Sequence, residues 1–304
     1  MGYQRRTSID LPHSKKMKIN NEWKDYQILA TGNGEKLERW KDVHLLRPDP
    51  QAIWKSQSNL SKFGKLNARY IRSETGGGHW EYLKPMPESW VVSWRDLKFR
   101  VKPMGFKHTG LFPEQAVNWA KMIDLIKEAD RPINVLNLFA YTGGATVACL
   151  SAGANVCHVD AAKNMVERAR ENVSLSGIGF ERSRFIVDDC KKFVTREIKR
   201  GKKYDAIILD PPSYGRGANG EIWKIENDLY DFVELCTGVL SDNPLFVLIN
   251  SYTTGLQPAV LNNILKMTMR GYKGTIDSYE VCLPTDEGIV LPCGASGMWQ
   301  GEKK

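Results

Sequence analysis

The sequence predicts a doubly wound α/β domain with a mostly parallel sheet, preceded by a smaller N-terminal α+β domain. Three observations lead to this prediction. From residue 113 onward, apolar strand-like runs alternate with helical segments. One of these runs, Tyr204–Leu209, is almost wholly apolar, as expected for a strand covered on both faces. Residues 21–108 contain only short strand-like segments, each bounded by turn signals.

This change of pattern predicts three parts of the chain. They are a flexible basic arm at residues 1–20, the small domain at 21–108 and the larger domain at 109–304. Within the small domain, short runs between glycine- and proline-rich turns predict five strands. These strands are expected at residues 26–30, 44–46, 80–83, 90–93 and 98–101.

The larger domain begins with a helix expected over residues 113–129, where apolar residues recur at helical spacing. Parallel strands are expected at 133–139, 156–159, 185–187, 204–209 and 245–249. The helices that follow them are expected at 144–151, 163–176, 191–199, 227–240 and 258–269. Two last strands, 275–283 and 287–292, are not separated by a helix, so we expect at least one of them to be antiparallel.

Positive charge and tryptophan are concentrated in the first third of the chain. The net charge is +8, with +10 in residues 1–110 and −2 in residues 111–304. Six of the nine tryptophans also lie in the first 110 residues. Basic residues interleaved with aromatic ones suit phosphate neutralisation and base stacking, so RNA is the expected partner of this region. The alternative is a tryptophan-containing core beneath a solvated basic face.

Other features exclude several classes of protein. No run approaches the roughly 20 apolar residues of a membrane span, and the N-terminus lacks the apolar segment of a signal peptide. The six cysteines form no C-x-x-C pair, which argues against a zinc site or thioredoxin-like chemistry. We therefore expect a cytoplasmic protein without a metal or membrane partner; an oligomer is compatible with the sequence.

Polar residues follow the first two expected strands of the larger domain, where open α/β sheets bind ligands. The first strand leads into a turn, 140–146, that contains Gly143 and Gly144, and adjacent glycines let a backbone approach a ligand closely. The turn lacks the G-x-G-x-x-G pattern of dinucleotide sites, which favours a smaller cofactor without phosphates. Asp160, after the second strand, can accept from ribose hydroxyls or cap the next helix.

Acidic residues follow the third and fourth strands. One of Asp188 and Asp189 can accept from an adenine amino group while the other caps a helix, and two acids that only cap or lie in solvent are the alternative. The fourth strand ends in Asp210-Pro211-Pro212-Ser213-Tyr214. Proline removes amide donors and holds the preceding residue extended, which leaves the Asp210 carboxylate and carbonyl oxygens as acceptors for a substrate amine. Tyr214 could stack on a base, and residues 215–220 could form a mobile substrate loop. The alternative is that residues 210–214 form a plain turn without a binding role.

Four motifs in order resemble class I S-adenosylmethionine-dependent methyltransferases, and most closely the bacterial large-subunit ribosomal RNA methyltransferase family in a short form without a PUA domain. The motifs are NLFAYTGGAT at 137–146, HVDAAKNMVERARENV at 158–173, DDCKKF at 188–193 and LDPPSYGRG at 209–217. The resemblance covers about residues 95–300 and includes the preceding stretch KFRVKPMGFKHTGLFPEQ.

The resemblance implies S-adenosylmethionine as the cofactor and a role for each motif. The turn Tyr141–Gly144, with Thr142 and Gly143 inside it, would hold the methionine part, Asp160 the ribose and Asp189 the adenine. Asp210, Pro211, Pro212 and Tyr214 would face the methyl acceptor, for which the family implies RNA, with ribosomal RNA favoured. Further cofactor-site positions implied by the motifs are Asn137, Phe139 and Gln115.

The choice of target atom depends on cysteine. Carbon 5 of cytosine becomes nucleophilic only after a thiolate adds to the ring, whereas an exocyclic nitrogen needs only acceptors for its hydrogens. The positions after the fourth and fifth strands hold no cysteine, so nitrogen methylation is favoured and Cys293 is the candidate for the cytosine reaction. Guanine N7 is a further possible target atom. Two other functions are alternatives: a small-molecule or protein methyltransferase with the N-terminal region as a lid, and a non-catalytic binding protein.

Overall fold

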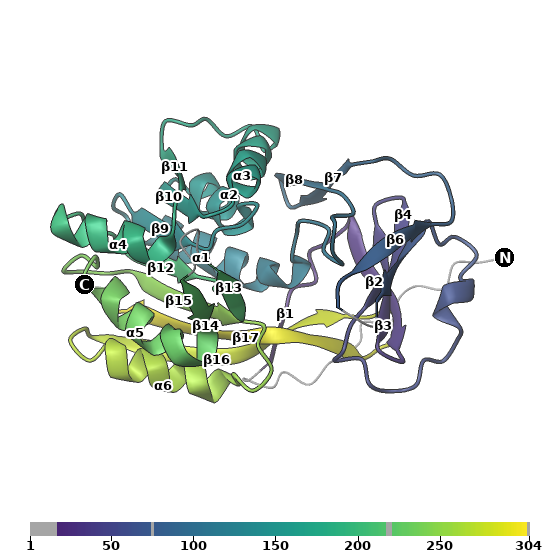
Figure 1. The fold of residues 1–304 in the computed structure, drawn as a ribbon. Coiled ribbons are helices and arrows are strands. Elements are labelled where there is room, and N and C mark those ends of the chain that lie inside the picture. The colour runs from purple at the N-terminus through teal and green to yellow at the C-terminus, as the bar shows by residue number, and fades with distance from the viewer. Residues whose placement is uncertain (1–16, 74–75, 217–220, 303–304) are drawn as a thin grey trace.

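The computed structural model describes residues 17–73, 76–216 and 221–302, and its large sheet confirms the predicted fold class (Figure 1). Eight strands are ordered β1-β16-β17-β15-β12-β9-β10-β11. Five of them are parallel, as the alternating pattern predicted: β9 (Asn134–Leu138), β10 (Asn155–Asp160), β11 (Ser183–Val187), β12 (Ala206–Leu209) and β15 (Phe246–Ser251).

The last two strands form a long hairpin at the edge of the parallel group. In it, β17 (Val290–Gly301) is antiparallel to both β15 and β16 (Gly274–Pro284), which confirms the expectation of an antiparallel strand. The other side of β16 pairs with β1 (Met17–Ile19). These three residues belong to the expected flexible arm, so that prediction was wrong for them because their backbone is hydrogen-bonded in the sheet; residues 1–16 of the arm lie outside the described residues.

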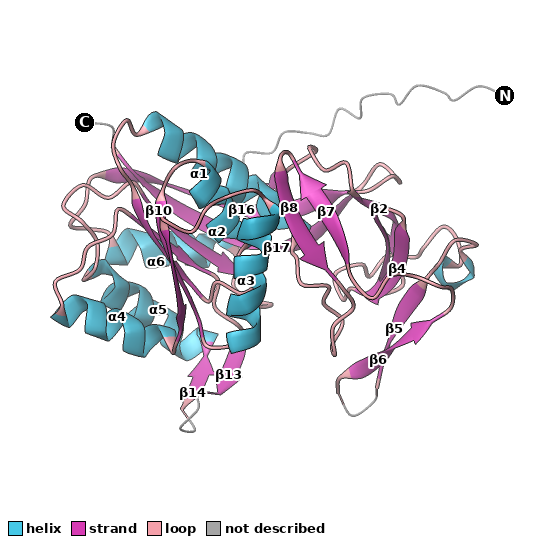
Figure 2. Ribbon diagram, turned by 90° about the horizontal axis from the view of Figure 1, so that it is seen from above, coloured by secondary structure: helices cyan, strands magenta, loops and turns pink. Residues whose placement is uncertain are grey.

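Helices cover both faces of the large sheet (Figure 2). One face carries α1 (Ala116–Glu128), α2 (Gly144–Ser151) and α3 (Lys163–Leu175), and the other carries α4 (Cys190–Lys199), α5 (Ile225–Thr237) and α6 (Pro258–Thr268). Both faces of the sheet are apolar and are covered by helices. In β9, for example, Val135 packs in the core on the first face and Leu136 packs in the core on the second. No helix among the described residues is both long and apolar enough to cross a membrane.

The N-terminal part contains a five-stranded sheet and a separate hairpin. The sheet is ordered β2 (Tyr26–Gly32), β3 (Glu35–Trp40), β4 (Val43–Pro48), β5 (Ala68–Arg72) and β6 (Gly78–Tyr82), and the hairpin is β7 (Trp90–Trp94) with β8 (Leu97–Val101). Two short 3-10 helices, η1 (Leu60–Lys62) and η2 (Pro113–Gln115), lie in the connections. The sequence did not predict β3 or β5.

Contacts join the two sheets and fix their relative position. The turn of the β16–β17 hairpin reaches the N-terminal sheet, where Glu287 accepts from the Thr31 amide at 2.8 Å. Next to it, Ile28 forms a β-bridge with Thr285. The N-terminal sheet therefore lies at one end of the large sheet (Figure 1). The predicted domain boundary after residue 108 stays a prediction.

Candidate active site

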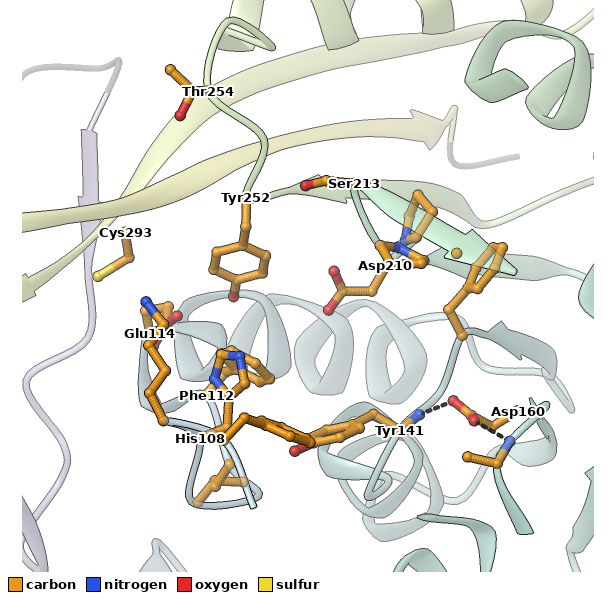
Figure 3. Close-up of a pocket in the computed structure, with 18 of the residues that line it drawn as sticks. His108, Phe112, Glu114, Tyr141, Asp160, Asp210, Ser213, Tyr252, Thr254 and Cys293 are labelled. Atoms are coloured by element: carbon orange, nitrogen blue, oxygen red, sulfur yellow. Dashed lines mark hydrogen bonds between the residues drawn. The ribbon is translucent and has the colours of Figure 1, made fainter. Parts of the chain in front are cut away.

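A cavity of about 600 Å³ lies at the carboxyl ends of the parallel strands, as expected for an open α/β sheet (Figure 3). Its walls include residues from three places. The ends of β9, β10 and β12 supply Phe139, Asp160 and Asp210, the segment before α1 supplies residues 106–108 and 111–114, and the N-terminal sheet supplies Lys36 and Arg47. A smaller recess of about 50 Å³ shares Phe139 and Asp210 with it and reaches Asn137 and Gly144.

The turn after β9 has an unusual backbone. Phe139 and Tyr141 have φ angles of 55° and 51°, a left-handed conformation that is unfavourable for side chains with a β-carbon. Asp160 stabilises this turn, because its Oδ2 accepts from the Tyr141 amide at 2.8 Å and its Oδ1 accepts from the Ala162 amide at 2.8 Å (Figure 3). The Asp160 carboxylate thus connects two of the predicted cofactor motifs.

The paired glycines serve packing as well as conformation. Gly143 has φ 81°, and a β-carbon there would lie 2.8 Å from Cβ of Ala169. A β-carbon on Gly144 would lie 2.5 Å from the ring of Trp119. We expected the glycines to give a ligand access to the backbone; the atoms that crowd these two positions belong instead to α3 and α1.

Both acids expected at the nucleoside end face the cavity. Burial raises the pKa of Asp160, and the two backbone amides oppose this shift. Asp189 caps α4 by accepting from the Lys192 amide at 2.8 Å, and its residue also lines the cavity. Its neighbour Asp188 pairs with Arg196. Asp189 therefore both caps a helix and lines the cavity, and its contact with adenine stays a prediction.

Three predicted cofactor residues are already hydrogen-bonded to protein. The amide nitrogen of Gln115 donates to the hydroxyl of Tyr252 at 2.8 Å, and its oxygen accepts from Asn118 and Asn250 at 2.8 and 3.0 Å. The Asn137 side chain donates to Thr146, and the Thr142 hydroxyl donates to the Gly110 carbonyl. These three side chains line the smaller recess and hold its walls in place.

Two carboxyl groups, those of Glu114 and Asp210, line the cavity at the end expected to take the methyl acceptor. Asp210 is held at the end of β12, and among the described residues none donates a hydrogen bond to its side chain. Burial, and then the charge of Glu114, raise the pKa of Asp210 to about 7. Glu114 is itself buried, which raises its pKa, and burial together with the charge of Glu114 raises the pKa of Tyr252. Figure 3 shows the Tyr252 ring between these two acids.

Of the acceptor-site residues predicted after β12, three line the cavity and one does not. Asp210, Pro211 and Pro212 line the cavity, and the Pro212 carbonyl accepts from the Trp223 indole at 2.7 Å. Tyr214 is not among the lining residues; its side chain is 49% exposed and its hydroxyl accepts from Arg216. The expected loop at 215–220 is flanked by a hairpin, β13 (Tyr214–Arg216) and β14 (Ile222–Lys224), and residues 217–220 lie outside the described residues.

Cys293 also lines the cavity, on β17. Its thiol donates to the Leu291 carbonyl at 3.4 Å. Burial, and then the charge of Glu114, raise the pKa of this thiol well above its usual range. A reactive cysteine needs a lowered pKa, so this environment opposes formation of the thiolate.

Sequence reasoning gave no role to several residues of the wall. Glu114 stands directly before the predicted Gln115, and Tyr252 lies in the polar segment after the fifth parallel strand, which the strand-end rule places next to the site. Trp223 packs against Phe139, with ring centroids 5.5 Å apart, but comes from the unpredicted strand β14. The cavity residues Lys36 and Arg47 could not be placed before the N-terminal sheet was known.

Known proteins resemble this chain over its whole length. The family model of S-adenosylmethionine-dependent methyltransferases matches residues 47–240. The crystal structure of a SAM-dependent methyltransferase from Agrobacterium tumefaciens is 32% identical, covers 99% of this chain and 98% of its own, and has a TM-score of 0.89. A protein solved in complex with S-adenosylhomocysteine shares the fold at 17% identity, with a TM-score of 0.73, covering 92% of this chain and 76% of its own.

Curated relatives include ribosomal RNA large subunit methyltransferases. Ribosomal RNA large subunit methyltransferase K of Neisseria meningitidis is 25% identical over 224 residues, which are 71% of this chain and 62% of that protein. Against other large-subunit methyltransferases, the chain spans about a third or less of their length. The match of the family model and the similarity to the Agrobacterium enzyme show that this chain belongs to the S-adenosylmethionine-dependent methyltransferase family, with S-adenosylmethionine as its cofactor.

Proposed function

We propose that this methyltransferase transfers its methyl group to a base nitrogen in RNA, with ribosomal RNA as the favoured substrate. The observation that carries the proposal is Asp210, a half-buried carboxyl that faces the cavity without a hydrogen-bond donor among the described residues. Its oxygens can therefore accept hydrogen bonds from a ligand in the cavity. The names of the curated relatives favour ribosomal RNA over other substrates.

The proposed cofactor residues fit S-adenosylmethionine. A carboxylate has about four positions at which it can accept, and backbone amides use two of those on Asp160. The remaining two suit the hydroxyls of a ribose. Asp189 retains a second oxygen for the adenine amino group, and Tyr141–Gly144 form the wall toward the methionine part. Gln115, Asn137 and Thr142 would act by fixing this wall, since their own side chains are occupied.

The proposed acceptor residues orient an amine. When bound, the cofactor supplies an activated methyl group, so the protein has mainly to position the nucleophile and accept its proton. The Asp210 carboxylate can accept one hydrogen of an exocyclic amine, and the Pro211 carbonyl is the proposed acceptor for the other. Drawing both hydrogens toward these oxygens localises the nitrogen lone pair. Because the pKa of Asp210 is about 7, this group can also take up the released proton near neutral pH.

Aromatic rings around the cavity suit a base taken out of its stack. Phe112 and Tyr252 pack with centroids 5.3 Å apart, and Phe139 and Trp223 line the same cavity. We assign stacking on the target base to these rings rather than to Tyr214, whose exposed side chain lies outside the wall.

The test is methyl transfer from tritium-labelled S-adenosylmethionine to ribosomal RNA purified from cells that lack this gene. Nuclease digestion and mass spectrometry then identify the methylated nucleoside. We expect one N-methylated base, formed by the wild-type protein and not by Asp210→Asn. Transfer to protein or to a small-molecule fraction, with none to RNA, would overturn the proposal, and a 5-methylcytosine product would overturn the choice of nitrogen.

A further inference from the structure

The wall of the cavity opposite the parallel strands contains three cations, of which two are paired. Arg47 donates to both carboxylate oxygens of Glu38 at 2.6 and 2.7 Å. Lys36 lies 3.1 Å from the carboxylate of Asp49. Two acids therefore neutralise two bases inside the N-terminal sheet, and these ion pairs contribute little net charge to the cavity.

Lys107 is the third cation, and it has no such partner. Within the described parts of the chain, no carboxylate lies within 4.0 Å of its amino group, and its hydrogen bond is a long one, 3.5 Å, to the Pro48 carbonyl. The neighbouring His108 is neutral near pH 7, because burial lowers its pKa to about 3. Among the described residues, Lys107 is thus the cation of this wall that has no ion-pair partner.

The backbone around Lys107 is held in place. Arg47 donates to the Lys107 carbonyl at 3.0 Å, so the buried ion pair with Glu38 also fixes this segment. On the other side, the Met104 amide donates to the His108 carbonyl at 3.1 Å. A turn fixed on both sides presents the lysine at a defined place in the wall, which favours a binding role over that of a mobile surface lysine.

The pKa of Lys107 is lowered, and binding of an anion would reverse this shift. Burial, and then the charge of Lys36, lower its pKa to about 8, and Asp49 only partly opposes this. A lysine keeps a normal pKa when an opposite charge lies nearby. An anion that binds here would restore the charged form, since each charge stabilises the other.

We propose that Lys107 forms an anion subsite in the cavity, which binds a backbone phosphate of the RNA next to the target base. The inference rests on the proposed function, because it assumes a polynucleotide substrate. The alternative source of an anion is the carboxylate of the cofactor. The phosphate is favoured because Lys107 contacts Arg47 and Pro48 of the N-terminal sheet and lines the large cavity, but not the smaller recess beside the turn after β9, which is the proposed methionine site.

The experiment compares the wild-type protein with Lys107→Gln and with Lys121→Gln, which removes an exposed lysine of α1. Each protein is saturated with S-adenosylhomocysteine and titrated with a single-stranded oligoribonucleotide of mixed sequence between 50 and 200 mM salt. One phosphate contact on single-stranded RNA contributes about 0.7 to the slope of log affinity against log salt. We expect Lys107→Gln to lose about 0.7 of this slope and to bind about fivefold more weakly at 0.1 M salt.

A second readout is proton uptake. At pH 8 Lys107 is about half protonated, so binding of a phosphate should take up as much as about half a proton, measured by calorimetry in buffers of different ionisation enthalpy. This uptake should vanish in Lys107→Gln and persist in Lys121→Gln. A merely structural lysine would not change it.

The outcomes separate the two proposals. An unchanged slope in Lys107→Gln, with RNA binding by the wild-type protein, overturns the phosphate subsite and leaves the proposed function intact. Weaker binding of S-adenosylhomocysteine by Lys107→Gln also overturns it, because the cofactor carboxylate would then be the anion. No binding of RNA by the wild-type protein overturns both. Equal unfolding temperatures of the three proteins exclude misfolding as the cause of a change.

Discussion

At the proposed cofactor end of the cavity, Asp160 is held by backbone amides, whereas at the acceptor end Asp210 has no donor from the described residues. The first arrangement is local, since the turn after β9 and the end of β10 meet across neighbouring strands. The second brings together Glu114, Asp210 and Tyr252 from three distant segments. The difference suggests a division of roles: the first end binds, and the second orients and accepts a proton.

The largest expected effect tests the acceptor end. In Asp210→Asn the side chain is a neutral amide that also donates, so it no longer acts as the charged acceptor of one amine hydrogen and cannot take up the released proton. We expect kcat to fall by about 10²–10⁴, the range for loss of a general base. Affinity for S-adenosylhomocysteine should stay within about twofold, because its proposed contacts lie at the other end.

The matched control is Asp124→Asn, which makes the same change on the exposed face of α1. Single-turnover kinetics give the rate of the chemical step, and calorimetry gives the affinity. Retention of the full rate by Asp210→Asn would refute the role of this carboxyl, and an equal loss in both variants would point to a nonspecific effect.

The next effect tests the cofactor end. Asp160→Ala removes the proposed ribose acceptor together with the partner of the Tyr141 and Ala162 amides. A hydrogen bond to a charged group contributes about 1.5–3 kcal/mol, so affinity for S-adenosylhomocysteine should fall by at least about tenfold. Asp160→Asn, which keeps one oxygen acceptor, should lose less. Calorimetric titration of both variants would contradict the division of roles if neither bound more weakly than the wild-type protein.

The comparison also explains what the sequence could predict. The expected helix at 144–151 has the same bounds in the structure, and Asp160, Asp189 and Asp210 all lie in the cavity wall. A strand, turn and helix that follow one another carry their signals in consecutive residues, and the strand-end rule then brings the acids together. This part of the fold and of the site could therefore be read from local patterns.

The remaining parts depend on contacts between distant residues. The sequence of β3, EKLERW, is too charged to predict a strand, and it forms one that buries Glu38 against Arg47 of β4. The same ion pair fixes the wall that holds Lys107. The expected position of Tyr214 differs from the structure because the hairpin that turns its side chain outward includes β14, whose residues show no strand pattern in the sequence.

A smaller effect concerns pH. Asp210 must be ionised to accept, and its pKa is about 7, so the rate of the chemical step should rise with pH up to about 7 and level off above it. Glu114→Gln removes a like charge, which should lower the pKa of Asp210 and move this rise to lower pH. The ratio of the variant's rate to the wild-type rate should thus be higher at pH 6 than at pH 8. Coincident single-turnover profiles of the two proteins would show that Glu114 does not act on Asp210.

The smallest expected effect decides between nitrogen and carbon as the target. Cys293 lines the cavity, but burial and Glu114 hold its pKa far above neutral, so almost no thiolate is present. Addition to a cytosine ring requires that thiolate, whereas transfer to a nitrogen requires no sulfur. Cys293→Ser should therefore keep the rate of RNA methylation within about twofold, because the two side chains are similar in size. Complete loss of methylation in this variant, with unchanged affinity for S-adenosylhomocysteine, would instead identify Cys293 as the nucleophile and cytosine as the target.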